Sequence, residues 1–556
     1  MAKSKDRLRI IPLGGLDEVG KNMTVFEYGE DMVLVDAGIM FPDDDHPGVD
    51  LILPDYSYVL QRADKLRGIV ITHGHEDHTG ALPYLLKDLQ RPVPVLGTKL
   101  TLGLVAGKLE EHKLKKVKMR EVHDGGHVSL GVFGFDFFAV NHSIPDAVGI
   151  FMRTPVANIV HTGDFKLDQT PIDGRLTDYG ALSRFGKLGV DLLMSDSTNA
   201  ETPGFTRSEA EVGKALREII ERAEQRVIVA SFSSHIHRVQ QVCDAAVDAG
   251  RKVVVTGRSM VTNTRIAREL GFLEIDDEDI IDAYDASGLA PEDVVVLCTG
   301  SQGEPLSALA RMANGDHKTV QVEKGDTVVI SASPVPGNEK AVSRVINRLA
   351  KAGAIVLHKG NASVHVSGHA ASEELKLMLN LVQPTYFMPI HGETRHLAAH
   401  ARLADEVGMY DDDVFVLDNG DCLEIGAEGA RLAQRVEHGV VYVDGLGVGD
   451  VGQVVLRDRQ LLAQDGIATI VIAIDAQTGR PMGDPELITR GIVFGPEGDA
   501  LLEEARARIA KTLAKTAKEG ATDQAVVKNA VRESLSQLLW ERTRRRPMII
   551  PVVMEV

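Results

Sequence analysis

The stretch ITHGHEDHTG at residues 71–80 gathers four metal-ligating side chains within six positions, directly after an apolar run. In an extended turn alternate side chains point the same way, so we expect His73 and His75 to face one ion while Asp77 and His78 face another. A structural zinc site typically closes four ligands around one ion, often with cysteine, and no cysteine lies here. The pattern therefore favours a hydrolytic metal centre but leaves the substrate open.

Further candidate ligands follow predicted strands elsewhere: His142 in AVNHSIPDAVG, Asp164 in HTGDF and His391 in MPIHGE. Seven ligands are too many for one zinc and suit two divalent ions about 3.5–4 Å apart that share a carboxylate. Ligation without thiolate favours Zn²⁺, with Mn²⁺ or Mg²⁺ as alternatives in activity. Some of the 19 histidines could instead be incidental. We assign one ion to His73, His75 and His142, the other to Asp77, His78 and His391, and the bridge to Asp164.

Short β-type runs and Gly-rich turns alternate over the first 200 residues and predict an α/β layered domain whose strands end at these ligands. From about residue 205, helices of about 12 residues alternate with strands of about 5, which is typical of a parallel doubly wound unit. After about residue 365 the pattern of short β-type runs and Gly-rich turns returns, so one domain is predicted to be inserted into another. The predicted boundaries are 1–204 and 367–445 for the outer domain and 205–366 for the insertion.

The Gly-rich stretch DGLGVGDVG introduces the last part of the chain. We predict a linker at 446–460 and a small α+β C-terminal domain at 461–556. In that domain, strands are expected over QLLAQDGIATIVIAID and PELITRGIVF, with a long helical stretch near 498–542.

Composition limits the class of protein. The 556 residues are 44% apolar and 25% charged, as in a globular protein with a proper core. Three isolated cysteines, no secretory signal and no apolar run of about 18 residues predict a reducing, cytoplasmic setting without a membrane. A net charge of −19 argues against non-specific coating of nucleic acid, but not against a nucleic-acid enzyme. Two basic clusters, at 113–120 and 542–546, are either solvated surface runs or binding surfaces.

HGHEDH, Asp36 in LVDAG, His142 and Asp164 resemble, in order, the motifs of the metallo-β-lactamase superfamily. The resemblance implies an αββα sandwich, and it implies that Asp36 orients the ligand loop rather than binding metal. Members of the superfamily hydrolyse lactams, thioesters and phosphodiesters, so the resemblance leaves the substrate undecided.

Asp196 in MSDST, His369 in HVSGHA and His391, 22 positions later, resemble motifs A, B and C of the β-CASP nucleases. That family places its inserted domain as a lid over a dinuclear site. A histidine oriented by a carboxylate is suited to protonate a leaving oxygen, so we predict catalytic roles for His369 and Asp196. Asp77 is predicted to be catalytic as well as a metal ligand. Packing or capping is the alternative role for the Asp196–His369 pair.

Motifs along essentially the whole chain, from GGLDEVGKNM to RRRPMIIPVVMEV, resemble the bacterial ribonuclease J family. The resemblance implies 5′→3′ exonuclease activity that favours 5′-monophosphate RNA, endonuclease activity, and a role in rRNA and mRNA maturation and decay. It also implies a homodimer or homotetramer assisted by the C-terminal domain, and possible contact with other RNA-decay proteins. The turns SFSSH and HVSGHA each lead into a helix and are candidate phosphate seats, although their serines could be plain helix caps. The candidate RNA-phosphate residues are Ser233, His235, His365, Ser367, Gly368 and His369.

Three rival functions differ in what they require. A small-ester or thioester hydrolase of the glyoxalase type would not need the insertion, Asp196 or His369. A non-catalytic RNA-binding scaffold would be expected to have lost ligands, and none is missing. A DNA-repair β-CASP nuclease stays open, because the choice of RNA depends on contacts to the 2′-OH that no motif reveals.

Overall fold

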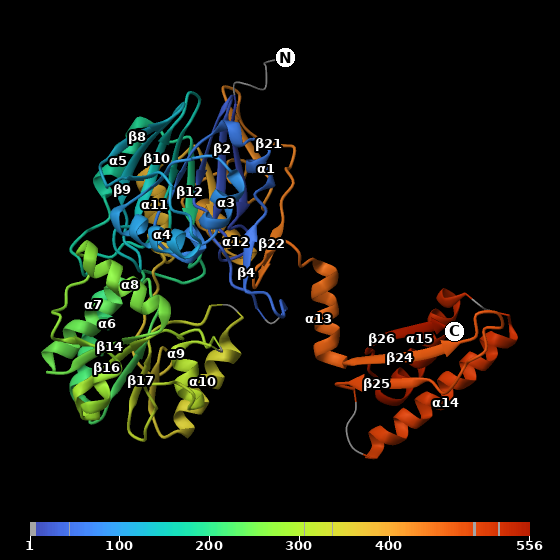
Figure 1. Cartoon of the computed structure of the whole chain (residues 1–556). Coiled ribbons are helices and arrows are strands. Elements are labelled where there is room, and N and C mark those ends of the chain that lie inside the picture. Colours follow the sequence, from blue (N-terminus) through green and yellow to red (C-terminus); the bar gives the residue numbers. More distant parts are fainter. Residues whose placement is uncertain (1–6, 44, 305, 336, 493–495, 521–522) are drawn as a thin grey trace. The chain divides into compact units, whose positions relative to one another are not determined.

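The computed structural model describes residues 7–43, 45–304, 306–335, 337–492, 496–520 and 523–556. Contacts divide the chain into two compact units (Figure 1), which are described separately here. The first unit comprises Met1–Phe41 and Leu51–Val441, and the second comprises Pro42–Asp50 and Tyr442–Val556. Within the described residues, no helix combines the length and apolar character needed to span a bilayer.

Two mixed sheets face each other in the first unit. In spatial order the first sheet is β21 (Gly429–Ala433), β20 (Cys422–Gly426), β1 (Leu8–Gly14), β2 (Met23–Tyr28), β3 (Asp31–Val35), β5 (Leu66–Val70), β6 (Val95–Gly97) and β7 (Met119–Glu121). The second is β19 (Tyr386–Ile390), β12 (Leu192–Asp196), β11 (Asn158–His161), β10 (Val148–Arg153), β9 (Phe133–Ala139) and β8 (His127–Leu130). Late strands therefore complete both early sheets: β20 pairs with β1, and β19 pairs in parallel with β12.

Alternation along β9 shows how the sheets acquire a common core. Phe133, Phe135 and Phe137 point into the apolar layer between the two sheets, whereas Phe138 points outward. Outside, the Phe138 ring lies 5.8 Å from the ring of Phe185 in α5. The helices and minor elements of this part are α1 (Ser57–Leu60), η2 (Ala63–Lys65), α2 (Glu76–Thr79), α3 (Leu82–Leu89), α4 (Lys99–Glu111), α5 (Tyr179–Leu188), α11 (Ser372–Val382), α12 (Thr394–Glu406), η5 (Asp411–Asp413) and β4 (Leu51–Pro54).

The inserted domain confirms the predicted parallel doubly wound unit. Its sheet runs β15 (Ile280–Ile281), β14 (Lys252–Thr256), β16 (Val294–Cys298), β13 (Val227–Ala230), β17 (Thr327–Ile330) and β18 (Ile355–His358), and each neighbouring pair is parallel. The helices are α6 (Glu209–Arg222), α7 (Ile236–Asp248), α8 (Arg258–Leu270), η3 (Asp285–Gly288), η4 (Pro291–Asp293), α9 (Ala308–Asn314) and α10 (Glu339–Lys351). Helix α8 packs against α4, so the insertion rests on the outer domain.

The second unit contains a sheet ordered β25-β24-β26, with α14 and α15 packed on one face. The strand predicted over QLLAQDGIATIVIAID is wrong in its first part, because residues up to Asp465 belong to α13 and Gly466, with φ 81°, ends that helix. Helix α13 also occupies 453–460 of the predicted linker. The elements are β22 (Val440–Asp444, which spans the boundary between the units), β23 (Gly447–Val448), α13 (Gln453–Asp465), β24 (Ile467–Ile474), β25 (Glu486–Arg490), α14 (Pro496–Lys518), α15 (Gln524–Thr543) and β26 (Met548–Glu555).

Candidate metal centre

The HGHEDH loop leaves the end of β5 and is held by the chain around Asn22 and Gly38. The Asn22 backbone N–H donates to the Asp77 carbonyl at 2.9 Å. A Cβ on Gly38 would lie only 1.6 Å from that same carbonyl oxygen, so glycine is required where the two segments meet. The loop geometry therefore depends on residues about 40–55 positions upstream.

Four of the predicted ligands converge in a first donor group: His73, His75, His142 and Asp164. The His75 Nδ1 atom lies 3.1 Å from both His73 Nε2 and His142 Nε2. Asp164 Oδ2 lies 3.7 Å from His73 Nε2 and 3.7 Å from His142 Nε2. A tetrahedral zinc with Zn–N of about 2.05 Å separates its nitrogen ligands by about 3.3 Å, so this spacing fits such an ion.

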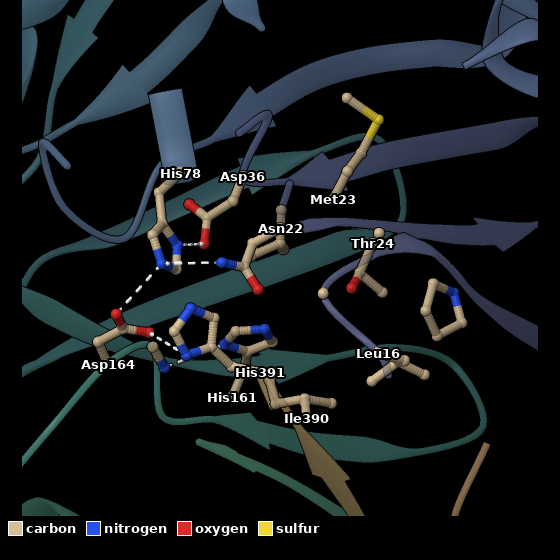
Figure 2. Close-up of a pocket in the computed structure, with 15 residues that line it drawn as sticks. Leu16, Asn22, Met23, Thr24, Asp36, His78, His161, Asp164, Ile390 and His391 are labelled. Carbon is tan, nitrogen blue, oxygen red and sulfur yellow. Dashed lines mark hydrogen bonds and ion pairs between the residues drawn. The ribbon is translucent and has the colours of Figure 1, made fainter. Parts of the chain in front are cut away.

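A second donor group shares the same carboxylate: Asp77, His78, Asp164 and His391. His78 Nε2 lies 3.2 Å from Asp164 Oδ2 and 3.7 Å from Asp77 Oδ2. His391 Nε2 lies 3.2 Å from Asp77 Oδ2. Figure 2 shows His78 between Asp36 and Asp164, with His391 reaching Asp164 from the other side. The structure thus assembles the two predicted ligand sets around Asp164.

The ring nitrogens that face away from the cluster have hydrogen-bond acceptors of their own. His142 Nδ1–H donates to the Gly368 carbonyl at 2.8 Å, and His391 Nδ1–H donates to Thr198 Oγ1 at 2.6 Å. Such partners fix the tautomer and the orientation of a metal-ligating histidine. The donor set and its orientation therefore fit a divalent-metal site.

Asp36 orients two ligands at once. Its Oδ2 accepts from His78 Nδ1 at 2.7 Å. The same carboxylate accepts from Thr72 Oγ1 at 2.9 Å, and that hydroxyl lies 3.1 Å from His73 Nδ1. Asp36 has φ 62°, a left-handed conformation that is uncommon for a residue with a side chain and that is kept where the surroundings demand it.

Replacing Asp36 by asparagine is expected to lower metal affinity about 10–100-fold, because an amide cannot accept equally well from both His78 and Thr72. Metal content after dialysis against graded chelator measures the effect. Asp31→Asn, at the other end of β3, is the control and should retain metal. Unchanged affinity in Asp36→Asn would contradict the orienting role.

The two donor groups differ in protonation. Burial lowers the pKa of His73 and His142 well below the ordinary range, and burial brings the pKa of His75 to about 4. For His78 and His391 burial acts the same way but nearby carboxylates, Asp164 first, outweigh it: the pKa of His78 is raised well above its ordinary value and that of His391 rises to about 10. A cation in the second group must therefore displace protons.

A cavity of about 10 Å³ lies behind the second donor group. Asn22, His161 and His391 are among its lining residues, as Figure 2 shows. Asn22 Nδ2 lies 3.1 Å from His78 Nε2, so this amide adjoins the nitrogen that would bind metal. Burial lowers the pKa of His161 to about 4 and keeps it neutral. The space is about that of one water molecule and too small for a substrate.

The predicted catalytic pair lies beside the donor groups. His369 Nδ1–H donates to Asp196 Oδ2 at 2.8 Å, and Asp196 also accepts from the Thr198 N–H at 2.9 Å. The His369 ring centroid lies 5.0 Å from that of His142 and 5.5 Å from that of His391. Burial alone would lower the pKa of His369, but Asp196 raises it above the ordinary value. His369 is 20% exposed in its side chain, which leaves its ring accessible to a substrate.

Gly368 contacts the predicted ligand His142. Besides accepting from His142, it lies so close that a Cβ would be 2.8 Å from His142 Cε1 and 2.9 Å from Nδ1. Gly368, a predicted phosphate contact, therefore also supports the ligand His142 of the first donor group.

Gly368→Ala is expected to displace His142 and to lower both bound metal and cleavage, by about the 10–100-fold typical of lost support around a ligand. Metal analysis and cleavage rate are measured together. Gly439→Ala provides the control, because a Cβ there meets nothing within 4 Å. Normal metal content in Gly368→Ala would refute this steric argument.

The other predicted phosphate contacts fall into two environments. His365 and Ser367 lie on the turn before His369, where Ser367 Oγ accepts from the His369 N–H at 3.1 Å. His365 Nδ1 is buried without a hydrogen-bond partner among the described residues. Ser233 is half-buried and its Oγ accepts from Asn263 Nδ2 at 3.2 Å.

His235 lies in the interior, only 2% exposed, and caps α7 by accepting from the Arg238 N–H. Arg238 is fully buried and pairs with Glu209 through Nε–Oε1 at 2.5 Å and Nη2–Oε2 at 2.8 Å. Its Nη1 donates to the Val364 carbonyl at 3.0 Å. This arrangement favours a role for His235 and Arg238 in holding the His365 turn rather than contacting phosphate.

Sequence reasoning missed several supporting residues. Thr198 lies in the same MSDST motif as Asp196, and Thr72 immediately precedes His73, so both could have been suspected from position. Asn22 lies in GGLDEVGKNM, a motif that the resemblance had already marked. Glu374 carried no signal: it is fully buried and accepts from the backbone N–H groups of Leu167 and Thr206.

Comparison with known proteins agrees along the whole chain. Ribonuclease J2 of Bacillus subtilis (strain 168) is 43% identical over 100% of this chain and 100% of its own length. Ribonuclease J of Mycolicibacterium smegmatis is 45% identical, covering 99% of this chain and 97% of its own. The chain belongs to the ribonuclease J family. The family resemblance and the fold class predicted from sequence are thus confirmed.

Domain families agree with this membership in the ribonuclease J family. The ribonuclease J β-CASP domain matches residues 224–349, and the ribonuclease J C-terminal domain matches 454–556. A β-lactamase superfamily domain matches 31–226, and a Zn-dependent metallo-hydrolase RNA specificity domain matches 358–417. A crystal structure of a protein of unknown function from Enterococcus faecalis V583 shares the fold, with a TM-score of 0.53 at 15% identity over 75% of this chain and 100% of that chain.

Proposed function

We propose that this protein is a ribonuclease that hydrolyses RNA phosphodiester bonds with two divalent metal ions, preferably Zn²⁺. One observation supports the proposal most directly: in a member of the ribonuclease J family, two four-residue donor groups share Asp164 and lie beside the His369–Asp196 pair. Within that pair, the hydrogen bond is 2.8 Å long. When bound, two divalent ions neutralise charge on a phosphoryl group and generate a nucleophile from water. A small ester or thioester would need neither His369 nor Asp196.

We assign separate roles in metal binding, ligand orientation and proton transfer to different residues. Asp164 and Asp77 supply the anionic ligands, and Asp36 and Thr198 keep the histidine rings aimed inward. His369, held by Asp196, donates a proton to the leaving 3′-oxygen, a role that suits a histidine whose pKa is raised by a carboxylate.

We further propose 5′→3′ exonuclease activity that prefers 5′-monophosphate RNA, together with endonuclease activity, in RNA maturation and decay. The turn that carries His365 and Ser367 directly precedes His369, so a terminal phosphate seated there would lie next to the reacting bond. His365 Nδ1, buried and unpartnered among the described residues, is available to such a phosphate. We also propose a homodimer or homotetramer acting in the cytoplasm.

The test incubates purified protein and Mn²⁺ or Zn²⁺ with RNA of one sequence carrying either a 5′-monophosphate or a 5′-triphosphate, beside the matching DNA. Mononucleotides released preferentially from the monophosphate RNA are the expected result. Equal activity on DNA would favour the DNA-repair nuclease instead. Metal binding without cleavage of RNA would exclude the ribonuclease.

A further inference from the structure

The basic cluster at 542–546, RTRRR, lies at the end of α15 and takes no part in the metal centre. Two of its arginines have partners within the second unit. Arg542 pairs with Glu504 through Nη2–Oε1 at 2.8 Å and Nε–Oε2 at 3.0 Å, and Arg545 donates to the Ile492 carbonyl. Of these two, Arg542 is neutralised by a carboxylate and Arg545 is held by a backbone carbonyl.

The other two arginines meet at an aromatic ring. The guanidinium carbon of Arg546 lies 4.7 Å from the ring centroid of Trp540, and that of Arg544 lies 5.5 Å from it. Both arginines are exposed, and neither forms an ion pair with a carboxylate of the described residues. In a chain with 80 acidic and 61 basic side chains, two adjacent unneutralised guanidinium groups need an explanation.

Trp540 is the chain's single tryptophan and is 38% exposed. It is not needed for the core, because α15 packs through other side chains: Val527, Val531, Leu535, Leu538 and Leu539. Stabilisation of the helix dipole would explain cations at this end of α15, where Arg544 is the capping residue, but would not explain an exposed indole between them. Aromatic side chains together with arginines are the groups on which single-stranded nucleic-acid sites stack bases.

We propose that Trp540, Arg544 and Arg546 form an auxiliary binding site for single-stranded RNA on the C-terminal unit. The inference rests on the proposed ribonuclease function and adds a second place where the chain holds its substrate. The planar guanidinium groups present paired N–H donors that match phosphate oxygens, and the aromatic and guanidinium planes offer stacking surfaces to bases. An acidic protein partner would pair with the two guanidinium charges, but it would have no bases to stack on the indole and guanidinium planes.

The single tryptophan makes the site directly observable. Full-length protein kept in EDTA, which prevents cleavage, is titrated with a 20-nucleotide single-stranded RNA while tryptophan emission and the anisotropy of a label on the RNA are followed. We expect emission to change in step with anisotropy. In Arg544→Ala/Arg546→Ala the slope of log affinity against log salt should become shallower by about 1.4, since each lost single-strand phosphate contact removes about 0.7.

Arg532→Ala is the matched control, because Arg532 is an exposed arginine on the same helix away from Trp540, and its slope should stay unchanged. RNA binding that leaves tryptophan emission constant, or an unchanged slope in the double variant, would overturn the site. Emission that changes with protein concentration in the absence of RNA would assign the surface to contact between copies and would equally overturn it.

The same protein separates this inference from the proposed function. With metal restored, cleavage of RNA by a protein whose tryptophan does not respond to RNA rejects the auxiliary site alone. A tryptophan response to RNA without any cleavage of RNA rejects the ribonuclease alone and keeps the binding site.

Discussion

Asp164→Asn is expected to abolish cleavage of RNA and to release bound metal. Asp164 belongs to both donor groups and approaches four imidazoles at 3.2–3.7 Å, so its loss weakens both ligand sets at once. Electrostatic stabilisation by bound cations amounts to several kcal/mol, and each ~1.4 kcal/mol is tenfold in rate, so the cleavage rate should fall by at least about 10³-fold.

Single-turnover cleavage and metal analysis on the same preparation measure both effects. Asp168→Asn serves as the control: Asp168 is also buried and lies four residues on, but it faces Lys166 and Ser208 instead of the histidines. It should lose stability while retaining metal. Full metal content and normal cleavage in Asp164→Asn would refute the shared-carboxylate arrangement.

His369→Ala should separate catalysis from metal binding. We expect cleavage to fall by about 10²–10⁴-fold, the usual contribution of general acid catalysis, with metal content nearly unchanged. The His369 ring is hydrogen-bonded to Asp196 and lies beside the ligands His142 and His391. Because Asp164, Asp196, His369 and His391 also lie close enough together to hold an ion, the metal content of the variant decides between a proton donor and a ligand. Asp196→Asn should lower turnover in the same direction, since it weakens the group that raises the pKa of His369.

His400→Ala is the matched control. His400 is a buried imidazole that forms a hydrogen bond with Ser197 Oγ, and it belongs to neither donor group. It should cost stability while turnover stays within a few-fold of the original. Loss of metal from His369→Ala would show that His369 is a ligand and would contradict its assignment as proton donor.

The cluster at 73–78 could be predicted because its four ligands lie within six positions of the sequence. The extended turn expected there is wrong in its second half, because Asp77 and His78 belong to α2 (Glu76–Thr79). The insertion could be predicted for a similar reason: alternation of helices and strands is a local pattern, and a parallel sheet follows from it. Residues 460–465 were misread as a strand because a short apolar run is ambiguous, and only Gly466 separates α13 from β24.

The contacts that orient the metal ligands could not be predicted from the sequence, because they join segments that are far apart along the chain. Thr198 reaches His391 across 193 positions, and Gly368 reaches His142 across 226. The first contact depends on β19 lying beside β12, a pairing that the order of strands in space decides. The second joins the segment after β9 to the segment before α11. The resemblance predicts a phosphate contact for His235, and the sequence does not reveal that packing buries this side chain against Arg238 and Glu209.

By itself the sequence determined the kinds of ligand, the strand ends that carry them and the existence of an inserted domain, since each of these follows from side-chain type and local periodicity. Only the tertiary structure decided that Asp164 lies at the centre of both donor groups, which ring nitrogen of each histidine faces inward, and that Arg238 is neutralised while Arg544 and Arg546 are not. Spacing sets directions within one element, whereas distances between elements are set by how the sheets and helices pack.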